Sequence, residues 1–181
     1  MIFLTPGDIL LRVLTPITFR VFLQNPNGFN ITKNNHLLLH DLQTCYNYGA
    51  VVLCFPETNT NWDQPNQIST LRSLFHSIWR KTSLQTLHTP DPFLSDYKPG
   101  GTLSAICDNW VSRVLFKGED PYGLGRWSYV TLCGKGSIKI TVITAYNATP
   151  SPGNSTYYHQ QLRVLSRIHH QQNIQSPPNP R

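Results

Sequence analysis

A strand, a helix and a second strand follow one another near the N-terminus, and this order restricts the fold more than any other feature. In residues 18–25 apolar side chains alternate at the period of a β-strand. Residues 34–49 begin with Asn residues suited to cap a helix, carry apolar residues near helical spacing and end at Gly49. Residues 50–55 form a short, continuous apolar run, typical of a buried parallel strand. The three segments predict a βαβ unit and hence an α/β protein.

The remainder of the chain predicts one more helix followed by short strands. Residues 64–81 carry a single apolar stripe, with basic residues towards the C-terminal turn. Five β-rich runs separated by Pro, Gly or Asp then predict an antiparallel meander: residues 83–89, 101–107, 111–116, 126–133 and 137–147. The "GKGS" at 134–137 reads as the turn of a hairpin rather than as a phosphate loop, because it lacks the phosphate-loop spacing. Residues 156–173 look helical.

The length of 181 residues suits one domain with a sizeable core, or part of one. We expect an N-terminal extension at 1–17, the domain at 18–175 and an open tail at 176–181, where "SPPNPR" cannot continue a helix.

The net charge of +6 is unevenly distributed along the chain. After Asp120 there is no carboxylate side chain, but there are six basic residues: Arg126, Lys135, Lys139, Arg163, Arg167 and Arg181. Such an asymmetry indicates a polyanionic partner such as nucleic acid. An ordinary basic surface is the alternative.

The cysteines and the N-terminus indicate the compartment. Cys45, Cys54, Cys107 and Cys133 show no CxxC spacing, and three lie in or beside apolar runs, where a thiol behaves as a small hydrophobic group. Pro and charged residues interrupt the apolar N-terminus, so it resembles neither a signal peptide nor a membrane span. We expect an intracellular protein with reduced thiols and no membrane partner.

Four separated motifs define a pattern: "LQNPNGFN" from residue 23, "VVLCFPETN" from residue 51, "PGGTLSAI" from residue 99, and "GLGRWSYVTL" from residue 123 followed by "IKITVITAYN". In this order and spacing they resemble the endonuclease/exonuclease/phosphatase superfamily, and most closely the endonuclease domain of LINE-type retrotransposons. The resemblance extends from about Thr18 to Tyr146. It implies an α/β sandwich of the DNase/AP-endonuclease-like type, with two sheets face to face and helices outside.

The resemblance also implies an enzyme that nicks DNA with Mg²⁺, or Mn²⁺, as cofactor. Glu57 matches the metal ligand, and a carboxylate after a buried strand lies where α/β sheets bind ligands. A Glu that caps the following helix is the alternative. Asn25 matches the asparagine that helps to hold metal and phosphate, since an amide can both donate and accept. Pro26 disfavours helical geometry at Asn25 and thereby favours an extended strand end, and Asn27 and Gly28 predict a turn after it.

Two further residues match the family less strongly. Tyr146 matches a tyrosine whose hydroxyl is hydrogen-bonded into the catalytic centre, although an aromatic residue at a strand end explains it locally. Arg126 matches an arginine or polar position near the nucleic acid, and a salt bridge at a strand edge explains it equally well.

His36 and His40 have the spacing of two metal ligands on one helix face, but two imidazoles are only half a site and the polar face of a helix is the simpler interpretation.

The family's later motifs, an Asp-x-Asn and a Ser-Asp-His, are absent, and no carboxylate after Asp120 can replace them. We therefore expect an incomplete sandwich from a truncated domain. The motifs that are present do not decide whether this chain alone is an active enzyme. By family the function is DNA nicking for target-primed reverse transcription, in the nucleus if active, with a reverse transcriptase domain in the full-length element. A non-catalytic nucleic-acid-binding module and a relic of a mobile element are the alternatives.

Overall fold

Two strands near the N-terminus lie side by side and parallel, as the βαβ pattern predicts. In this computed structural model, β1 (Val21–Leu23) pairs with β2 (Val52–Pro56), and α1 (Asn35–Asn47) connects them. Gly49 ends the helix with a positive φ of 67°, and the Ala50 N–H reaches back to the carbonyl of Cys45 at 3.0 Å. These are the features of a Schellman motif, which favours glycine because the left-handed region has no penalty for a residue without Cβ.

The remaining strands divide between two sheets. The four-stranded sheet has the order β1-β2-β4-β3 and the three-stranded sheet the order β5-β6-β7. In chain order the further elements are α2 (Pro65–Ile78), β3 (Thr82–Leu87), β4 (Thr102–Cys107), the 3-10 helix η1 (Asp108–Arg113), β5 (Val114–Glu119), β6 (Trp127–Cys133) and β7 (Lys139–Ala145).

The prediction of one antiparallel meander from five strands is therefore wrong in part. Only β5, β6 and β7 form it, whereas β4 pairs with β3 on one side and with β2 on the other. Strand pairing of this kind joins segments far apart in the sequence, and local patterns do not report it. The predicted hairpin turn is confirmed, since the N–H of Gly134 donates to the carbonyl of Ile138 at 2.7 Å between β6 and β7. The second helix ends at Ile78, so Arg80 and Lys81 follow it.

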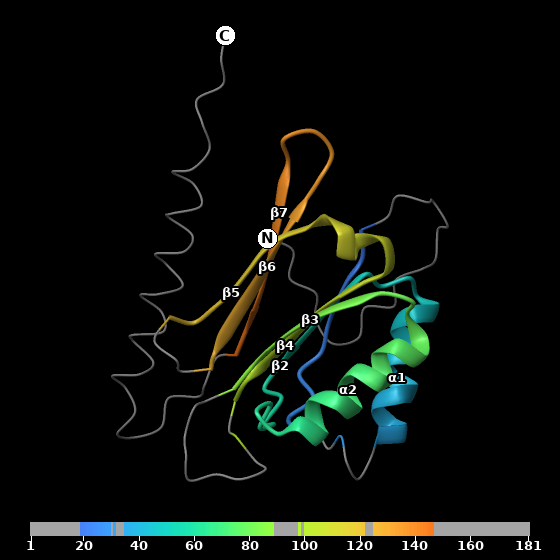
Figure 1. Cartoon of the computed structure of the whole chain (residues 1–181), viewed down its shortest axis with the longest axis vertical. Helices are drawn as coiled ribbons and strands as arrows, with labels where there is room; N and C mark the ends of the chain where they lie inside the picture. Colours follow the sequence, from blue (N-terminus) through green and yellow to red (C-terminus); the bar gives the residue numbers. More distant parts are fainter. Residues whose placement is uncertain are drawn as a thin grey trace. The chain divides into compact units, whose positions relative to one another are not determined.

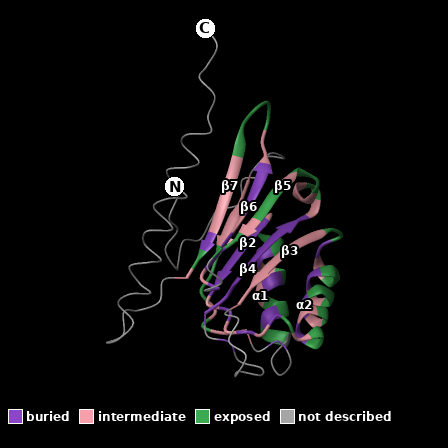
Figure 2. Ribbon diagram, turned by 60° about the vertical axis from the view of Figure 1, so that its left-hand side comes forward, coloured by how far each residue is buried: buried purple, intermediate pink, exposed green. Residues whose placement is uncertain are grey.

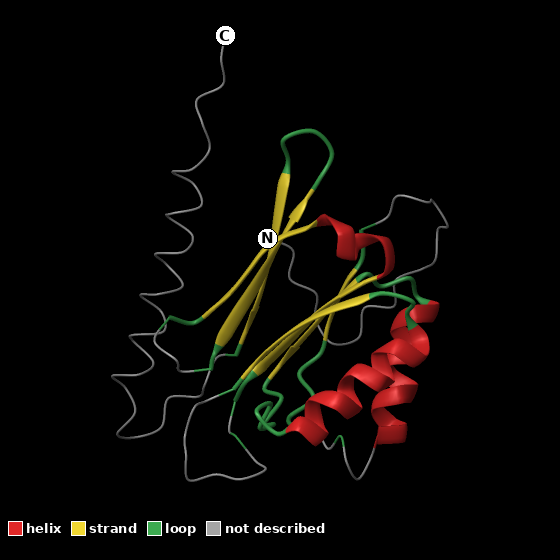
Figure 3. Cartoon of the chain, in the orientation of Figure 1, coloured by secondary structure: helices red, strands yellow, loops and turns green. Residues whose placement is uncertain are grey.

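The central strands β2 and β4 are covered on both faces (Figure 2). On β2, Leu53 and Phe55 point to the core shared with the two helices, which lie on the outer face of the four-stranded sheet (Figure 3). Val52 and Cys54 point the other way, into a second core that Val130 and other residues of the three-stranded sheet complete. This arrangement explains the continuous apolar run of residues 50–55, because a strand buried on both faces does not alternate between apolar and polar side chains.

The layer between the two sheets changes from apolar to polar along the strands. Thr102 and Ser104 of β4 meet Ser128 of β6 and Thr144 of β7, and all four side chains are buried. Their hydroxyl groups form a chain, with 2.8 Å between Thr102 Oγ1 and Ser128 Oγ, 3.4 Å between Ser128 Oγ and Ser104 Oγ, and 2.6 Å between Ser104 Oγ and Thr144 Oγ1. The polar part lies at the end where β1 and β2 terminate.

Side chains of β5 tie the three-stranded sheet to β3. Lys117 Nζ donates to the carbonyl of Leu84 at 3.1 Å, and Gln85 Nε2 donates to Glu119 Oε2 at 3.3 Å. Burial lowers the pKa of the Lys117 ammonium from its ordinary value. These contacts and the hydroxyl chain join the sheets with polar interactions as well as apolar packing.

The structure describes residues 19–29, 31, 35–88, 98, 100–121 and 125–146 (Figure 1). The chain divides into two compact units, 1–146 and 147–181, and every described residue belongs to the first. The predicted N-terminal extension, the helix at 156–173 and the C-terminal tail lie outside the described residues. None of the described helices is long and apolar enough to cross a lipid bilayer.

We predict that Thr144→Val lowers the free energy of unfolding by about 1–3 kcal/mol, because it leaves the buried Ser104 hydroxyl without its 2.6 Å partner. Chemical denaturation measures the loss. The double variant Ser104→Ala/Thr144→Val should lose less free energy of unfolding than the sum of the losses in the two single variants, because both polar partners are then removed. Thr86→Val, the same substitution at a half-buried position of β3, should cost less. Equal losses at the two threonines would contradict a structural role for the hydroxyl chain.

Candidate metal and phosphate site

The carboxyl ends of β1 and β2 bring Asn25 and Glu57 into direct contact. Because the two strands are parallel and in register, with Leu23 opposite Cys54, both strands end at the same edge of the sheet. Asn25 Nδ2 donates a hydrogen bond of 2.8 Å to Glu57 Oε2. Two residues separated by 32 positions in the sequence thus form one polar pair at the sheet's edge.

The loop after β1 holds the Asn25 amide in one orientation. The backbone N–H of Asn27 donates to Asn25 Oδ1 at 2.9 Å, so the amide oxygen faces the backbone and the amide nitrogen faces the carboxylate. The Gly28 N–H donates to the Glu57 carbonyl at 2.9 Å, which ties the loop to the end of β2. Asn25 therefore fixes the orientation of Glu57. As predicted, Asn27 and Gly28 form the turn, both with positive φ.

Glu57 occupies a backbone conformation that its side chain does not favour. Its φ is +59°, and Asn59 also has a positive φ of 50°. Non-glycine residues in this region carry strain of about 1–3 kcal/mol, and such strain tends to concentrate at functional sites. Glu57 does not cap α2, because the N-cap residue of that helix is Gln64. The helix-cap interpretation is therefore wrong.

Backbone hydrogen bonds to the Gly100–Gly101 segment hold the strained residues in place. The Asn59 N–H donates to the Gly100 carbonyl at 2.7 Å, and the Gly100 N–H donates to Asn59 Oδ1 at the same distance. Only glycine fits at position 101, because a Cβ there would lie 2.7 Å from the Leu87 carbonyl oxygen and 2.8 Å from Thr58 Oγ1 and would clash with both. The two glycines let β4 begin directly against the Glu57 loop.

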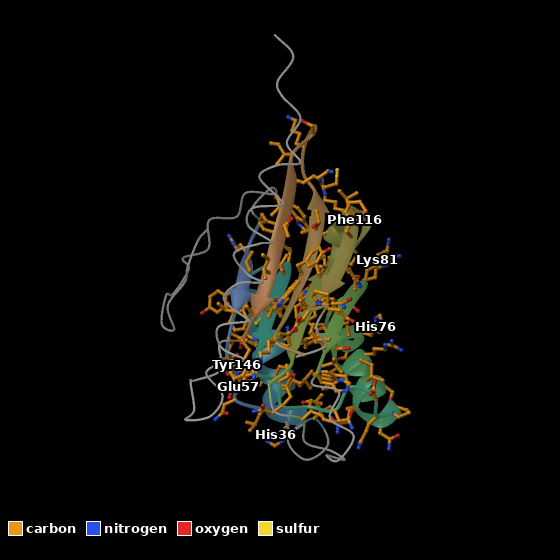
Figure 4. All side chains as sticks on the ribbon, turned by 90° about the vertical axis from the view of Figure 1, so that its left-hand side faces the viewer. His36, Glu57, His76, Lys81, Phe116 and Tyr146 are labelled. Atoms are coloured by element: carbon orange, nitrogen blue, oxygen red, sulfur yellow. The ribbon has the colours of Figure 1, made fainter. Side chains whose placement is uncertain are left out.

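Tyr146 lies at the same end of the sheets as Glu57 (Figure 4). Its ring packs against Gly100, where an added Cβ would lie 3.4 Å from Tyr146 Cδ1. The Tyr146 N–H donates to the carbonyl of Arg126 at 2.8 Å, so the predicted arginine neighbours the predicted tyrosine. The structure thus gathers all four predicted residues at one end, with Asn25 and Glu57 in direct contact.

Sequence reasoning missed two features of this end. The first is Asn59, whose role depends on its contact with Gly100, and its only local signal is its place two residues after Glu57. The second is a polar contact at the end of β3, where His88 Nε2 lies 3.2 Å from Asp63 Oδ2. The His88 side chain is only 11% exposed, whereas that of Asp63 is 85% exposed. No local pattern links these two residues.

The donor atoms of Glu57 and Asn25 suit Mg²⁺ or Mn²⁺, which prefer oxygen ligands. Among the described residues, no three or more His, Cys, Asp or Glu side chains gather as a metal site. His36 and His40 are exposed on α1 and belong to no such group. Mg²⁺ retains several waters and needs only one or two carboxylates, and Glu57 is a carboxylate of this kind.

None of the cysteines belongs to this pair, and three of them are buried as small hydrophobic groups, as predicted. All four are free thiols in the structure. Burial raises the pKa of Cys45 to about 12 and that of Cys54 to about 11, and it also raises the pKa of Cys107. These thiols stay protonated at neutral pH and are poor ligands and nucleophiles.

A comparison with solved structures identifies the architecture. An AP endonuclease from Archaeoglobus fulgidus matches with a TM-score of 0.51 and 18% identity, over 84% of this chain and 50% of its own. An endonuclease/exonuclease/phosphatase family protein from Leptotrichia buccalis C-1013-b matches with a TM-score of 0.49 and 11% identity, over 74% of this chain and 55% of its own. The chain therefore spans about half the length of these proteins. Searches of protein-family models and of curated proteins gave no match.

The fold is thus an α/β sandwich of the DNase/AP-endonuclease-like type. At 18% identity the likeness to the AP endonuclease describes the architecture and leaves the chemistry to be argued from this chain's own residues.

We predict that Glu57→Gly is more stable than Glu57→Ala by about 1 kcal/mol, because both variants lose the carboxylate but only glycine relieves the positive φ of 59°. Thermal or urea unfolding of the two variants measures the difference. Ser69, an exposed position inside α2, provides the matched control, and there glycine should be less stable than alanine by about 1 kcal/mol. The same order of stability at both positions would show that Glu57 is not strained.

Proposed function

We propose that the Asn25–Glu57 pair is the metal anchor of a Mg²⁺-dependent phosphodiesterase that acts on DNA, of the kind found in LINE-type retrotransposons. Mn²⁺ suits the same oxygen donors. The observation that supports the proposal best is the 2.8 Å hydrogen bond that orients Glu57 on a strained backbone at the carboxyl end of β2. A surface glutamate needs neither the strain nor a dedicated partner. A metal ligand benefits from both, because they hold the carboxylate in one geometry.

Each residue has a definite task in this proposal. Glu57 would hold Mg²⁺, which when bound supplies charge stabilisation to a phosphate oxygen. Asn25 donates to one oxygen of Glu57 and prevents the carboxylate from rotating away. Tyr146 presents a hydroxyl group at the same end of the sheets, and Arg126, beside it, adds positive charge for the phosphate backbone.

Hydrolysis also needs a group that activates water, and residues 121–181 contain no carboxylate. Asp63 and His88 form an acid–imidazole pair at the same end of the sheet, but β3, which precedes His88, lies two strands away from β2. We therefore propose that this chain binds metal and DNA while nicking DNA weakly or not at all. The proposal includes a nuclear location and an associated reverse transcriptase.

A non-catalytic nucleic-acid-binding module, or a relic of such an element, is the second candidate. One observation favours it, namely that basic residues continue after Asp120 while acidic residues stop. In that case DNA binding would not require Glu57 or Mg²⁺.

We predict that Mg²⁺ strengthens binding of a fluorescent DNA duplex by the wild-type chain, and that Glu57→Gln abolishes this strengthening because the amide cannot replace the anionic metal ligand. Anisotropy titrations with Mg²⁺ and with EDTA measure the effect. Asn25→Ala should retain part of it, since the carboxylate remains but is no longer oriented. Asp63→Asn, at an exposed carboxylate on the same edge, is the control and should behave as wild type.

The same samples incubated with supercoiled plasmid measure nicking, which should be weak or absent in all of them. Mg²⁺-dependent binding that survives Glu57→Gln would contradict the metal anchor and favour the non-catalytic module.

A further inference from the structure

The two ends of the strands carry opposite charge. At the end with the candidate metal site lie four carboxylates, Glu57, Asp63, Glu119 and Asp120, with Lys98 and Arg126 as the basic residues described there. At the opposite end, where β3 and β7 begin and β6 ends, the described part of the chain has a single carboxylate, Asp108. Lys81 lies well apart from Glu57 and Tyr146 in Figure 4.

Five exposed basic residues gather at this second end, and we name them the distal basic patch: Arg80, Lys81, Arg113, Lys135 and Lys139. Arg20 also lies there but is left out, because it is only half exposed and its Nη1 donates to the Tyr48 carbonyl after α1 at 2.6 Å.

Hydrogen bonds and strand pairing connect members of the patch across both sheets. The N–H of Asp108, the first residue of η1, donates to the Lys81 carbonyl at 2.8 Å, and Arg113 ends the same short helix. Arg113 Nη1 donates to the carbonyl of Cys133 at 3.4 Å, and Cys133 pairs directly with Lys139. These contacts place the members of the patch at the same end of both sheets.

The hairpin of β6 and β7 gives the patch a shape. Its tip extends beyond the other strands in Figure 1 and is exposed in Figure 2. Lys135 lies in the turn and Lys139 is the first residue of β7, so both sides of the tip carry an ammonium group. The Arg113 guanidinium lies 5.0 Å from the centre of the Trp110 ring, which fixes a cation at the base of the hairpin.

A protruding two-stranded ribbon with a basic tip has the dimensions of an element that enters the major groove of B-DNA. The deep, narrow major groove of an RNA duplex does not admit side chains in this way. We propose that the distal basic patch is a binding surface for duplex DNA, with the β6–β7 hairpin in the major groove and Arg80, Lys81 and Arg113 on the flanking phosphates.

This surface is independent of the candidate metal site. The seven residues of β6 span about 23 Å at roughly 3.3 Å per residue, so the two ends contact different segments of DNA. The inference therefore does not rest on the proposed phosphodiesterase activity, and it places no requirement on Glu57 or Mg²⁺.

The test measures binding of a short fluorescent DNA duplex in EDTA at several salt concentrations. For Lys139→Gln, in the hairpin, we expect weaker binding. For Lys81→Gln we expect a salt slope reduced by about 0.9, the value for one lost phosphate contact, and for Arg80→Gln/Lys81→Gln a reduction of about 1.8. Arg72→Gln removes one exposed charge from α2, outside the patch, and should leave the slope unchanged. Glu57→Gln should also leave it unchanged, which separates this result from a failure of the metal anchor.

Three outcomes would overturn the proposal. The first is equal weakening by Lys139→Gln and Arg72→Gln, which would show that only net charge matters. The second is stronger binding to anionic vesicles or to an RNA duplex than to DNA. The third is displacement of the protein by the minor-groove ligand distamycin but not by the major-groove ligand methyl green, since the hairpin requires the opposite order. Circular dichroism melting of each variant confirms that the fold is retained.

Discussion

Burial of β2 on both faces is the constraint on which the rest of the structure depends. Leu53 and Phe55 anchor the helices, and Val52 and Cys54 anchor the second sheet, so the strand has no freedom to slip in register. A shift by one residue would exchange the two faces of the strand. The exact position at which the chain leaves the sheet, and with it the position of Glu57, is therefore set by core packing.

The same packing explains why a polar site can exist at one end of an apolar layer. Near the middle of the strands, the sheets meet through aliphatic side chains, and towards the site they meet through the hydroxyl chain from Thr102 to Thr144. Hydroxyl groups that satisfy one another remain buried without large penalty and bring a polar environment up to the sheet's edge. The glycines at 100 and 101 then let the backbone of β4 approach the Glu57 loop closely enough to hydrogen-bond with it.

The sequence was sufficient to predict features that depend on local patterns. The βαβ unit, the turn after Asn25, the hairpin at 134–137 and the common location of Asn25 and Glu57 all follow from periodicity, turn residues and motif order. The sequence was not sufficient to predict how the strands divide between two sheets, because burial across the whole core determines which strands pair with β4. Neither did it reveal the positive φ of Glu57 or the Asp63–His88 pair, which arise from contacts between distant segments.

The left-handed backbone at Glu57 also has an evolutionary consequence. Glycine or asparagine would suit this conformation better than glutamate, so the carboxylate costs folding stability at this position. In a related chain under no selection for the carboxylate, substitutions at position 57 that improve folding would be favoured. A glutamate at this position in related chains would therefore indicate selection for the carboxylate rather than for the fold.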